Sequence, residues 1–224
     1  MKQKPFMIDD YPKLVKFFAS SNPVHLLLFV LPLWVLSFYL MSGSSTSGLT
    51  LVLSFLGGVL YWSFLEYAIH RWLYHSKYPT RALHYFLGSF HLYHHRNMGD
   101  HRVLTAGFLM IYLMTPLVLS PLLYFTQDPG VFGAATLGLT AFYYFYEWIH
   151  YTLHYKVHQS GYLNYIQKYH LHHHDRAPRK NFGNTSHLWD VVLGTYDPSY
   201  ADYQMPLSTR DTLITLKLVL ADET

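Results

Sequence analysis

Four long runs of apolar residues dominate the pattern along the chain. They cover residues 24–41, 49–69, 104–125 and 130–149, and each is close to the roughly 20 residues that a helix needs to cross a bilayer. The second and fourth runs carry one charge each, Glu66 and Glu147, near their ends, and Pro116 and Pro121 predict a kink in the third. Four such runs are difficult to hide in one soluble core, so we expect membrane-spanning helices rather than a soluble bundle.

Short polar connections join the runs in pairs. Residues 42–48 link the first two runs, and a turn with Asp128 and Pro129 links the last two. All 16 Lys and Arg residues lie outside these connections: before the first run, between the second and third, or after the fourth. The positive-inside rule places those three regions in the cytoplasm. The pattern therefore predicts an all-α integral membrane fold, with two helical hairpins, cytoplasmic termini and a cytoplasmic helical cap.

The composition excludes several classes of protein. Hydrophobic residues make up 51% and charged residues 13% of the chain, which excludes a disordered protein. The absence of cysteine excludes disulfide scaffolds, Cys-ligated zinc fingers, iron–sulfur clusters and Cys nucleophiles. A net charge of +3 is too small to indicate nucleic-acid binding. The unusual number is 16 histidines, as many as Lys and Arg combined.

Ten of these histidines follow a repeated pattern after the second and fourth runs. Each half of the chain has an acidic residue, two spaced histidines and a His-x-x-His-His triplet: Glu66, His70, His75, His91, His94 and His95, then Glu147, His150, His154, His170, His173 and His174. Two membrane crossings separate the halves, so both sets emerge on the same face. We expect them to build one shared site.

The spacing indicates metal ligation. Each triplet places its histidines at i, i+3 and i+4, which is one face of a helix, and His150 and His154 are one turn apart. His70 and His75 are five apart and are predicted to straddle a helix end. Ten ligands shared by two ions give five each and leave an open octahedral position, whereas a structural zinc site is closed by four. Imidazole ligands suit iron, copper, nickel and zinc alike, so the ligand type does not identify the metal.

The run from His170 to His174 contains four histidines, one more than the His-x-x-His-His triplet needs. On a helix His172 points away from the face shared by His170, His173 and His174, so we predict that His172 is not a ligand and that His173 is. An extended segment would instead bring His170, His172 and His174 together.

Other polar residues are expected to support the site. Glu66 and Glu147 precede a histidine by about one turn, where a carboxylate can accept an imidazole N–H; the alternative is a helix-end charge that reaches lipid headgroups. His187 and Asp190 are further candidates for this supporting shell. Structural roles are expected for the histidines outside the pattern, and an interfacial one for that at the start of the first run: His84, His101, His158 and His25.

The motifs resemble a known family. His-Arg-Trp-Leu-Tyr-His (70–75), His-Leu-Tyr-His-His (91–95), His-Tyr-Thr-Leu-His (150–154) and His-Leu-His-His-His (170–174) resemble the histidine boxes of the fatty acid hydroxylase superfamily of integral membrane non-haem di-iron oxygenases. Residues 64–67 and 182–190 are most similar to the fatty acid 2-hydroxylase branch, and the resemblance covers about residues 50–197. No His-Pro-Gly-Gly haem motif is present, so no fused cytochrome b5 domain is expected.

The resemblance implies an O2-dependent hydroxylase with two iron ions, or zinc in purified protein, acting on a fatty acyl or sphingolipid chain. It also implies a separate cytoplasmic electron donor of the cytochrome b5, ferredoxin or reductase type, in a bacterial inner membrane or the endoplasmic reticulum. We expect a hydroxylase-like domain over residues 24–205, between an N-terminal segment (1–23) and an interfacial tail (206–224). A sterol or carotenoid substrate and a non-enzymatic metal carrier are the alternatives; apolar span centres disfavour transport.

Overall fold

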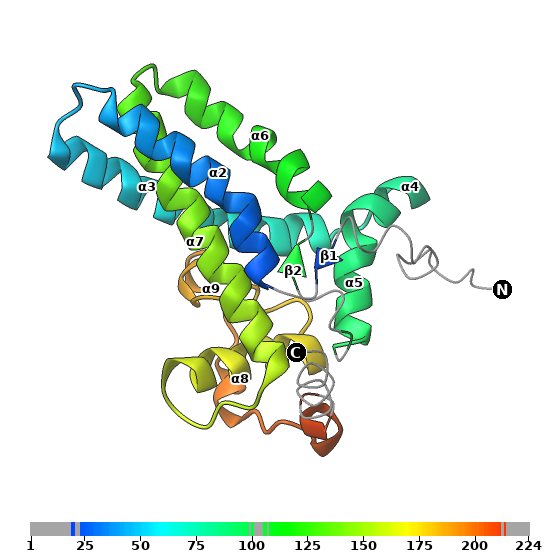
Figure 1. The fold of residues 1–224 in the computed structure, drawn as a ribbon. Helices are drawn as coiled ribbons and strands as arrows, with labels where there is room; N and C mark the ends of the chain where they lie inside the picture. Colours follow the sequence, from blue (N-terminus) through cyan, green and yellow to red (C-terminus); the bar gives the residue numbers. More distant parts are fainter. Residues whose placement is uncertain are drawn as a thin grey trace.

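Four long helices form the body of the molecule. The computed structural model describes residues 19–20, 23–98, 100, 105–106, 108–211 and 213. The four helices are α2 (Pro23–Ser42), α3 (Gly48–Ala68), α6 (Phe108–Phe125) and α7 (Pro129–Tyr155), and they coincide with the four apolar runs. The other elements gather at one end of this bundle, so the helical architecture and the cap are as predicted (Figure 1).

The two helical hairpins have their tips side by side. Each tip is closed by a side chain that caps the following helix: Ser47 accepts a hydrogen bond from the Thr50 N–H, and Asp128 accepts one from the Gly130 N–H. The Thr46 hydroxyl donates to Asp128 Oδ1 over 2.7 Å and so joins the two tips. Because both tips lie at one end, both histidine-bearing regions must lie at the other (Figure 1).

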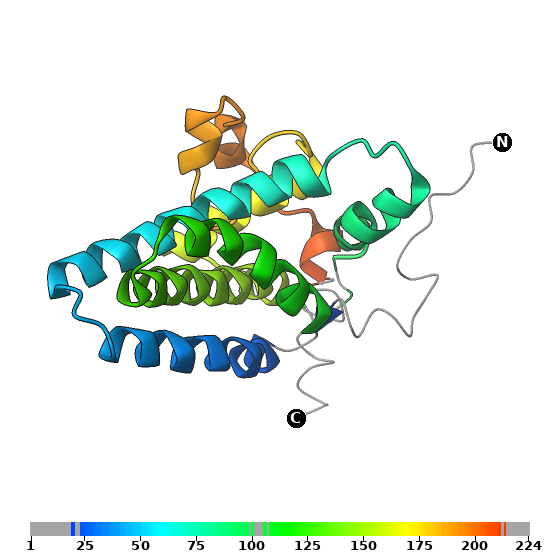
Figure 2. The ribbon, with the colours of Figure 1, turned by 90° about the horizontal axis from the view of Figure 1, so that it is seen from above.

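Helix α7 occupies the centre of the bundle and packs against both α2 and α3 (Figure 2). Two glycines allow the backbones of α3 and α7 to approach closely. A Cβ atom at Gly58 would lie 2.0 Å from the Ala135 carbonyl oxygen, and one at Gly138 would lie 2.0 Å from the Phe55 carbonyl oxygen. Small residues at such a crossing favour van der Waals packing of helices in a membrane.

Two helices among the described residues are long and apolar enough to cross a bilayer. They are Val24–Ser42 and Gly48–Tyr74, and the described apolar part of α6 is the shorter stretch Thr115–Phe125. Helix α7 is rich in glycine, alanine, threonine and tyrosine, many of them buried, and is less apolar than the other two. Helices α2 and α3 present exposed apolar side chains such as Leu28, Val35 and Leu53.

Short helices build the cap that carries the histidines. In chain order they are the π-helix η2 (Ile69–Tyr74), α4 (Arg81–Leu83), the π-helix η3 (His84–Gly88), α5 (Ser89–Arg96), α8 (Gly161–Asp175), α9 (Leu188–Val192) and the 3₁₀ helix η5 (Pro198–Asp202). Strands β1 (Ala19–Ser20) and β2 (Thr105–Ala106) pair in antiparallel orientation. Helix α8 packs on the end of α7 through a buried cluster: Ile149, Leu153, Ile166 and Tyr169.

Three of the predicted features fall wholly or mostly outside the described residues. These are the N-terminal segment 1–23, His101, and the tail 206–224 beyond its described positions. Within the tail, residues 207–211 are helical and Leu213 is buried.

Candidate metal centre

A π-helix brings the first two histidines together. The amide of His75 donates to the carbonyl oxygen of His70, an i→i+5 hydrogen bond that extends α3 by one wider turn. This turn places residues five apart on the same side, and the two ring centroids are 5.1 Å apart. The helix ends at Tyr74 and His75 caps it, so His70 and His75 lie on either side of the helix end, as the sequence predicted.

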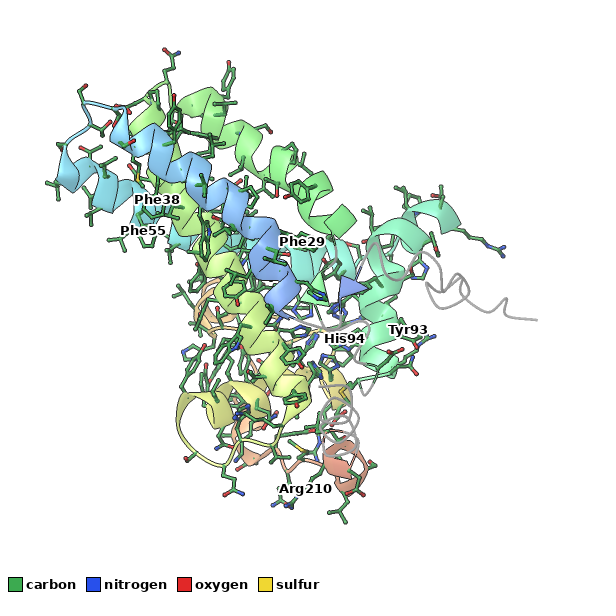
Figure 3. All side chains as sticks on the ribbon, viewed as in Figure 1. Phe29, Phe38, Phe55, Tyr93, His94 and Arg210 are labelled. Atoms are coloured by element: carbon green, nitrogen blue, oxygen red, sulfur yellow. The ribbon has the colours of Figure 1, made fainter. Side chains whose placement is uncertain are left out.

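Nine of the ten predicted ligands form two groups. In each group the candidate ligand nitrogens all lie within 4.8 Å of one another. We call them the first group (His70, His75, His91, His95 and His173) and the second group (His94, His150, His154 and His170). All except His75 and His95 are buried. His94 lies where α5 faces the end of α7 (Figure 3).

The two halves of the chain exchange one ligand. His94 belongs to the triplet of the first half but lies in the second group, with its Nε2 3.1 Å from His150 Nε2. His173 is its counterpart in the second triplet and lies in the first group, with its Nε2 3.2 Å from His75 Nε2. The middle histidine of each triplet therefore crosses to the group of the other half. This exchange brings rings from α5 and α8 into contact, with the His95 and His173 centroids 4.9 Å apart.

His174 lies between the groups. Its ring stacks on His95 with centroids 3.8 Å apart, and its centroid lies 4.4 Å from that of His170 and 4.9 Å from that of His94. Both of its ring nitrogens are buried without a hydrogen-bond partner among the described residues. A buried imidazole in this state is costly unless an ion or a water molecule binds it. His174 is thus placed to complete the second group.

The geometry of both groups fits bound metal ions. Five Nε2–Nε2 pairs within the groups lie 2.7–3.2 Å apart. Nitrogens about 2.1 Å from one ion lie about 3.0 Å apart at octahedral right angles and about 3.4 Å apart in a tetrahedron. The observed separations match the octahedral spacing. His70 Nε2, which points into the first group, is buried without a partner among the described residues.

The rings are also in the protonation state that binds metal. Burial lowers the pKa of His75 to about 4 and the pKa of His173 to about 3. Burial and neighbouring rings hold the pKa values of His91, His95 and His174 well below the ordinary value. These five imidazoles are therefore neutral at pH 7, as metal ligation requires.

Two backbone carbonyls orient rings of the first group. His70 Nδ1–H donates to the Phe182 carbonyl over 2.5 Å, and His173 Nδ1–H donates to the Lys180 carbonyl over 2.6 Å. A ligand ring that donates through one nitrogen presents the other to the ion in a fixed tautomer. Sequence reasoning missed both carbonyls, because a backbone acceptor leaves no signal in residue types.

Two of the candidate carboxylates, Glu66 and Asp190, bind backbone amides. Glu66 was expected to accept an imidazole N–H, but it accepts hydrogen bonds from the Asn184 N–H (2.6 Å), the Thr185 N–H (2.8 Å) and the Thr185 hydroxyl (2.9 Å). Asp190 accepts from the Phe182 N–H (2.9 Å) and the Gly183 N–H (2.8 Å). Both side chains hold the segment that orients His70.

A cavity lies between the four long helices. It is lined mainly by apolar side chains of α2, α3, α6 and α7, and its polar end contains Glu66 and the buried Glu147. Two tyrosines of its wall touch the groups: the Tyr74 ring stacks on His91 at 4.8 Å, and the Tyr146 ring stacks on His150 at 6.1 Å. These two tyrosines therefore connect the wall of the cavity to both groups.

The remaining histidine candidates lie elsewhere. His172 hydrogen-bonds Ser199 Oγ through its Nε2 and belongs to neither group. The exposed His187 accepts a short hydrogen bond from the Tyr165 hydroxyl at the start of α9, and the structure places it in neither group. The His158 ring bonds the Thr152 carbonyl.

Comparison with known proteins identifies the family. The model of the fatty acid hydroxylase family matches residues 55–195. The chain belongs to the fatty acid hydroxylase family. Hydroxylases of this family are oxidoreductases. The match confirms, at the level of the family, both the resemblance and the expectation of a lipid hydroxylase.

Individual relatives are similar over the same region. A dihydroceramide fatty acyl 2-hydroxylase of Arabidopsis thaliana is 35% identical over 70% of this chain and 67% of its own length. A ceramide very long chain fatty acid hydroxylase of Schizosaccharomyces pombe is 33% identical over 70% of this chain and 45% of its own length. A mouse fatty acid 2-hydroxylase is 30% identical over 67% of this chain and 41% of its own length.

A solved structure has the same fold. The visible hydroxylase domain of full-length scs7p superimposes with a TM-score of 0.68 at 24% identity, covering 84% of this chain and 70% of that one. The fold of a fatty acid hydroxylase domain thus accounts for most of the chain.

Proposed function

We propose that this protein is a membrane-embedded, O2-dependent di-iron hydroxylase that places a hydroxyl group on carbon 2 of a fatty acyl chain, most closely one carried by a sphingolipid. The names of the relatives supply the position and the lipid class. The site residues supply the chemistry, because ten buried or half-buried imidazoles in two groups fit two ions with open positions. The hydroxylase-like domain covers residues 24–205.

The proposed ligands divide between the ions as the two groups do. His70, His75, His91, His95 and His173 would hold one ion, and His94, His150, His154, His170 and His174 the other. Bound iron supplies the oxygen chemistry that turns an unactivated C–H bond into C–OH; zinc can occupy the same imidazole sites in purified protein. The protein contributes neutral, oriented rings and a dry approach to them.

The observation that carries the proposal is the cavity whose wall includes Tyr74 and Tyr146, because these rings stack on a histidine of each group. Its apolar wall, which includes Val30, Leu139 and Val118, suits an acyl chain, whereas Glu66 and Glu147 lie where the polar end of the lipid would sit. Carbon 2 is next to the acyl carbonyl, so the chain must enter the cavity while the carbonyl stays near the histidines. Tyr74 and Tyr146 would limit how the chain passes between the groups.

We also propose the membrane arrangement from the charge pattern. Helices α2, α3, α6 and α7 would cross the bilayer as two hairpins, with the tips at Thr46 and Asp128 outside and the cap in the cytoplasm. An acyl chain would then enter from the bilayer, and a separate cytoplasmic electron donor would approach the cap. Reporter fusions at Ser45 and Gly130 should behave as exported, and fusions at Tyr78 and Ser199 as cytoplasmic.

Lipid analysis tests the activity directly. Cells that express the protein should accumulate fatty acyl lipids with one added oxygen at carbon 2, as measured by mass spectrometry with fragmentation. Cells that express His94→Ala should not, because one ion loses a buried ligand. Metal-loaded protein that adds oxygen to no lipid class would contradict the proposal and favour a metal-binding protein without catalysis.

A further inference from the structure

Tyr146 connects the wall of the cavity to the second group. It lines the cavity from α7, one helical turn before His150, and its ring lies nearly parallel to the His150 ring, with an interplanar angle of 4°. Its side chain is half-buried. A molecule that is bound by Tyr146 inside the cavity therefore lies next to a candidate metal ligand.

Asn184 determines which way the Tyr146 hydroxyl group faces. Asn184 Nδ2 donates to the Tyr146 hydroxyl oxygen over 3.4 Å. The same buried side chain interacts with His170, whose Nε2 lies 2.7 Å from His154 Nε2 in the second group. A ligand ring that directs Nε2 at an ion carries its proton on Nδ1. This N–H favours the carbonyl end of the Asn184 amide and leaves the NH2 end for Tyr146.

The Tyr146 proton is left for a ligand. A phenol hydroxyl can accept and donate at the same time, and this one accepts from Asn184 without any other hydrogen bond among the described residues. Tyr143, which also lines the cavity, differs because its hydroxyl bonds the Glu147 side chain. Tyr146 therefore offers a hydrogen-bond donor to the interior of the cavity.

The charges around the cavity favour an acceptor without a net charge. The described residues that line it include Glu66 and Glu147 and no basic side chain. A free fatty acid would bring a carboxylate next to two acidic side chains with no cation to pair it, which is unfavourable away from water. The carbonyl oxygen of an acyl amide or ester has no net charge and accepts a hydrogen bond from a phenol.

We propose that the Tyr146 hydroxyl donates a hydrogen bond to the acyl carbonyl oxygen of a neutral amide or ester substrate, that Asn184 orients this hydroxyl, and that the contact sets hydroxylation at carbon 2. The inference rests on the proposed function and names the residue that anchors its substrate. Carbon 2 is bonded to the carbonyl carbon, so a carbonyl held by Tyr146 keeps carbon 2 beside the histidines. Without this anchor the chain can slide along the apolar wall and present neighbouring carbons.

Ligand binding to the zinc-loaded full chain in detergent tests the contact without oxygen chemistry. The probes are methyl hexadecanoate and methyl hexadecyl ether, which differ only in the carbonyl oxygen. The wild type should prefer the ester, and Tyr146→Phe should reduce the ratio of the two dissociation constants by about 2- to 10-fold, the worth of one hydrogen bond. The zinc content should not change, because a Phe ring can still stack on His150.

Two further variants make the result specific. Tyr144→Phe is the matched control, because it removes a hydroxyl from the same helix where the ring packs against Trp34, and it should keep the wild-type ratio. Asn184→Asp replaces the donor with a carboxylate, which accepts the Tyr146 proton instead. This variant should lose the preference for the ester although Tyr146 is unchanged. Circular dichroism checks that each variant is folded.

The position of the hydroxyl group in cellular lipids provides a second readout. The wild type should hydroxylate carbon 2, whereas Tyr146→Phe should spread the product over neighbouring carbons, as measured by mass spectrometry with fragmentation. An unchanged binding ratio in Tyr146→Phe, an equal loss in Tyr144→Phe, or a loss in Tyr74→Phe alone would overturn the inference. Tighter binding of ionised hexadecanoate than of its methyl ester would also overturn it. Wild-type protein that prefers the ester but hydroxylates no lipid would instead contradict the proposed function.

Discussion

The two histidine groups use matching residues but are held differently. Four ligands of the first group come from η2, from His75 at the end of η2 and from α5, and the fifth, His173, comes from α8. The carbonyls of Phe182 and Lys180 accept the Nδ1–H groups of His70 and His173 in this group. The second group takes its ligands from the long helix α7, from α8 and from His94, and its rings pack against one another, with the His94 and His154 centroids 4.4 Å apart. The repeat in the sequence therefore does not place its two sets of histidines on the same kinds of element.

The largest effect is expected from the exchanged ligands. His173→Ala should lose the first-group ion and keep the second, and His94→Ala should do the reverse, because each histidine crosses to the group of the other half. Both variants should lose nearly all hydroxylation, at least about 100-fold, since each removes a ligand that touches a catalytic ion. Site-resolved metal content distinguishes them; loss of the same ion in both variants would contradict the exchange.

Acid should destabilise the metal-free protein. His75 and His173 have folded pKa values of about 4 and about 3, so the unfolded chain binds more protons than the folded one between those values and about 6.5. The free energy of unfolding should therefore fall as the pH falls through this window, by up to about 1.4 kcal/mol per pH unit for each such histidine. Thermal unfolding of metal-free protein from pH 7.5 to 4.5 measures this. A constant unfolding temperature would show that these rings are not buried and neutral.

A smaller loss of stability is expected at the crossing of α3 and α7. Gly58→Ala would force a Cβ atom against the Ala135 carbonyl and separate the helices, at a cost of about 1–3 kcal/mol. Gly57→Ala, one position away, should cost nothing or stabilise the helix slightly. Thermal unfolding in detergent compares the two. Equal unfolding temperatures for the two variants would mean that α3 and α7 cross at a greater distance than the structure shows.

The smallest effect is expected at His172. Its ring bonds Ser199 and lies in neither group, so His172→Ala should retain both ions and most activity, unlike the neighbouring His173→Ala. The metal-to-protein ratios of the two variants decide the matter. Loss of an ion only in His172→Ala would indicate that the ligands follow an extended rather than a helical register.

Periodicity and spacing predicted much of the fold and most of the histidines that the structure brings together in the two groups. The apolar runs located all four long helices, and helical spacing set His172 apart from His170, His173 and His174. These features depend on local repetition along the chain, which residue types record directly. The same runs predict that α6 and α7 also cross the membrane, whereas the helices long and apolar enough to do so among the described residues are Val24–Ser42 and Gly48–Tyr74.

The remaining features depend on contacts between distant segments. The π-helix at His70, the exchange of His94 and His173 and the hydrogen bonds to the backbone carbonyls of residues 180 and 182 depend on tertiary contacts, and no residue type marks them. Glu66 illustrates the limit well. Its distance from His70 along the helix suggested an imidazole partner, but buried amides 118 and 119 positions away take its oxygens.

Anomalous diffraction from crystals of the zinc-loaded full chain tests the central claim most directly. We expect two separate anomalous peaks, one bounded by His70, His75, His91, His95 and His173, and the other by His94, His150, His154, His170 and His174. A single peak, or a peak ligated by His172 in place of His173, would contradict the two-ion, exchanged-ligand centre.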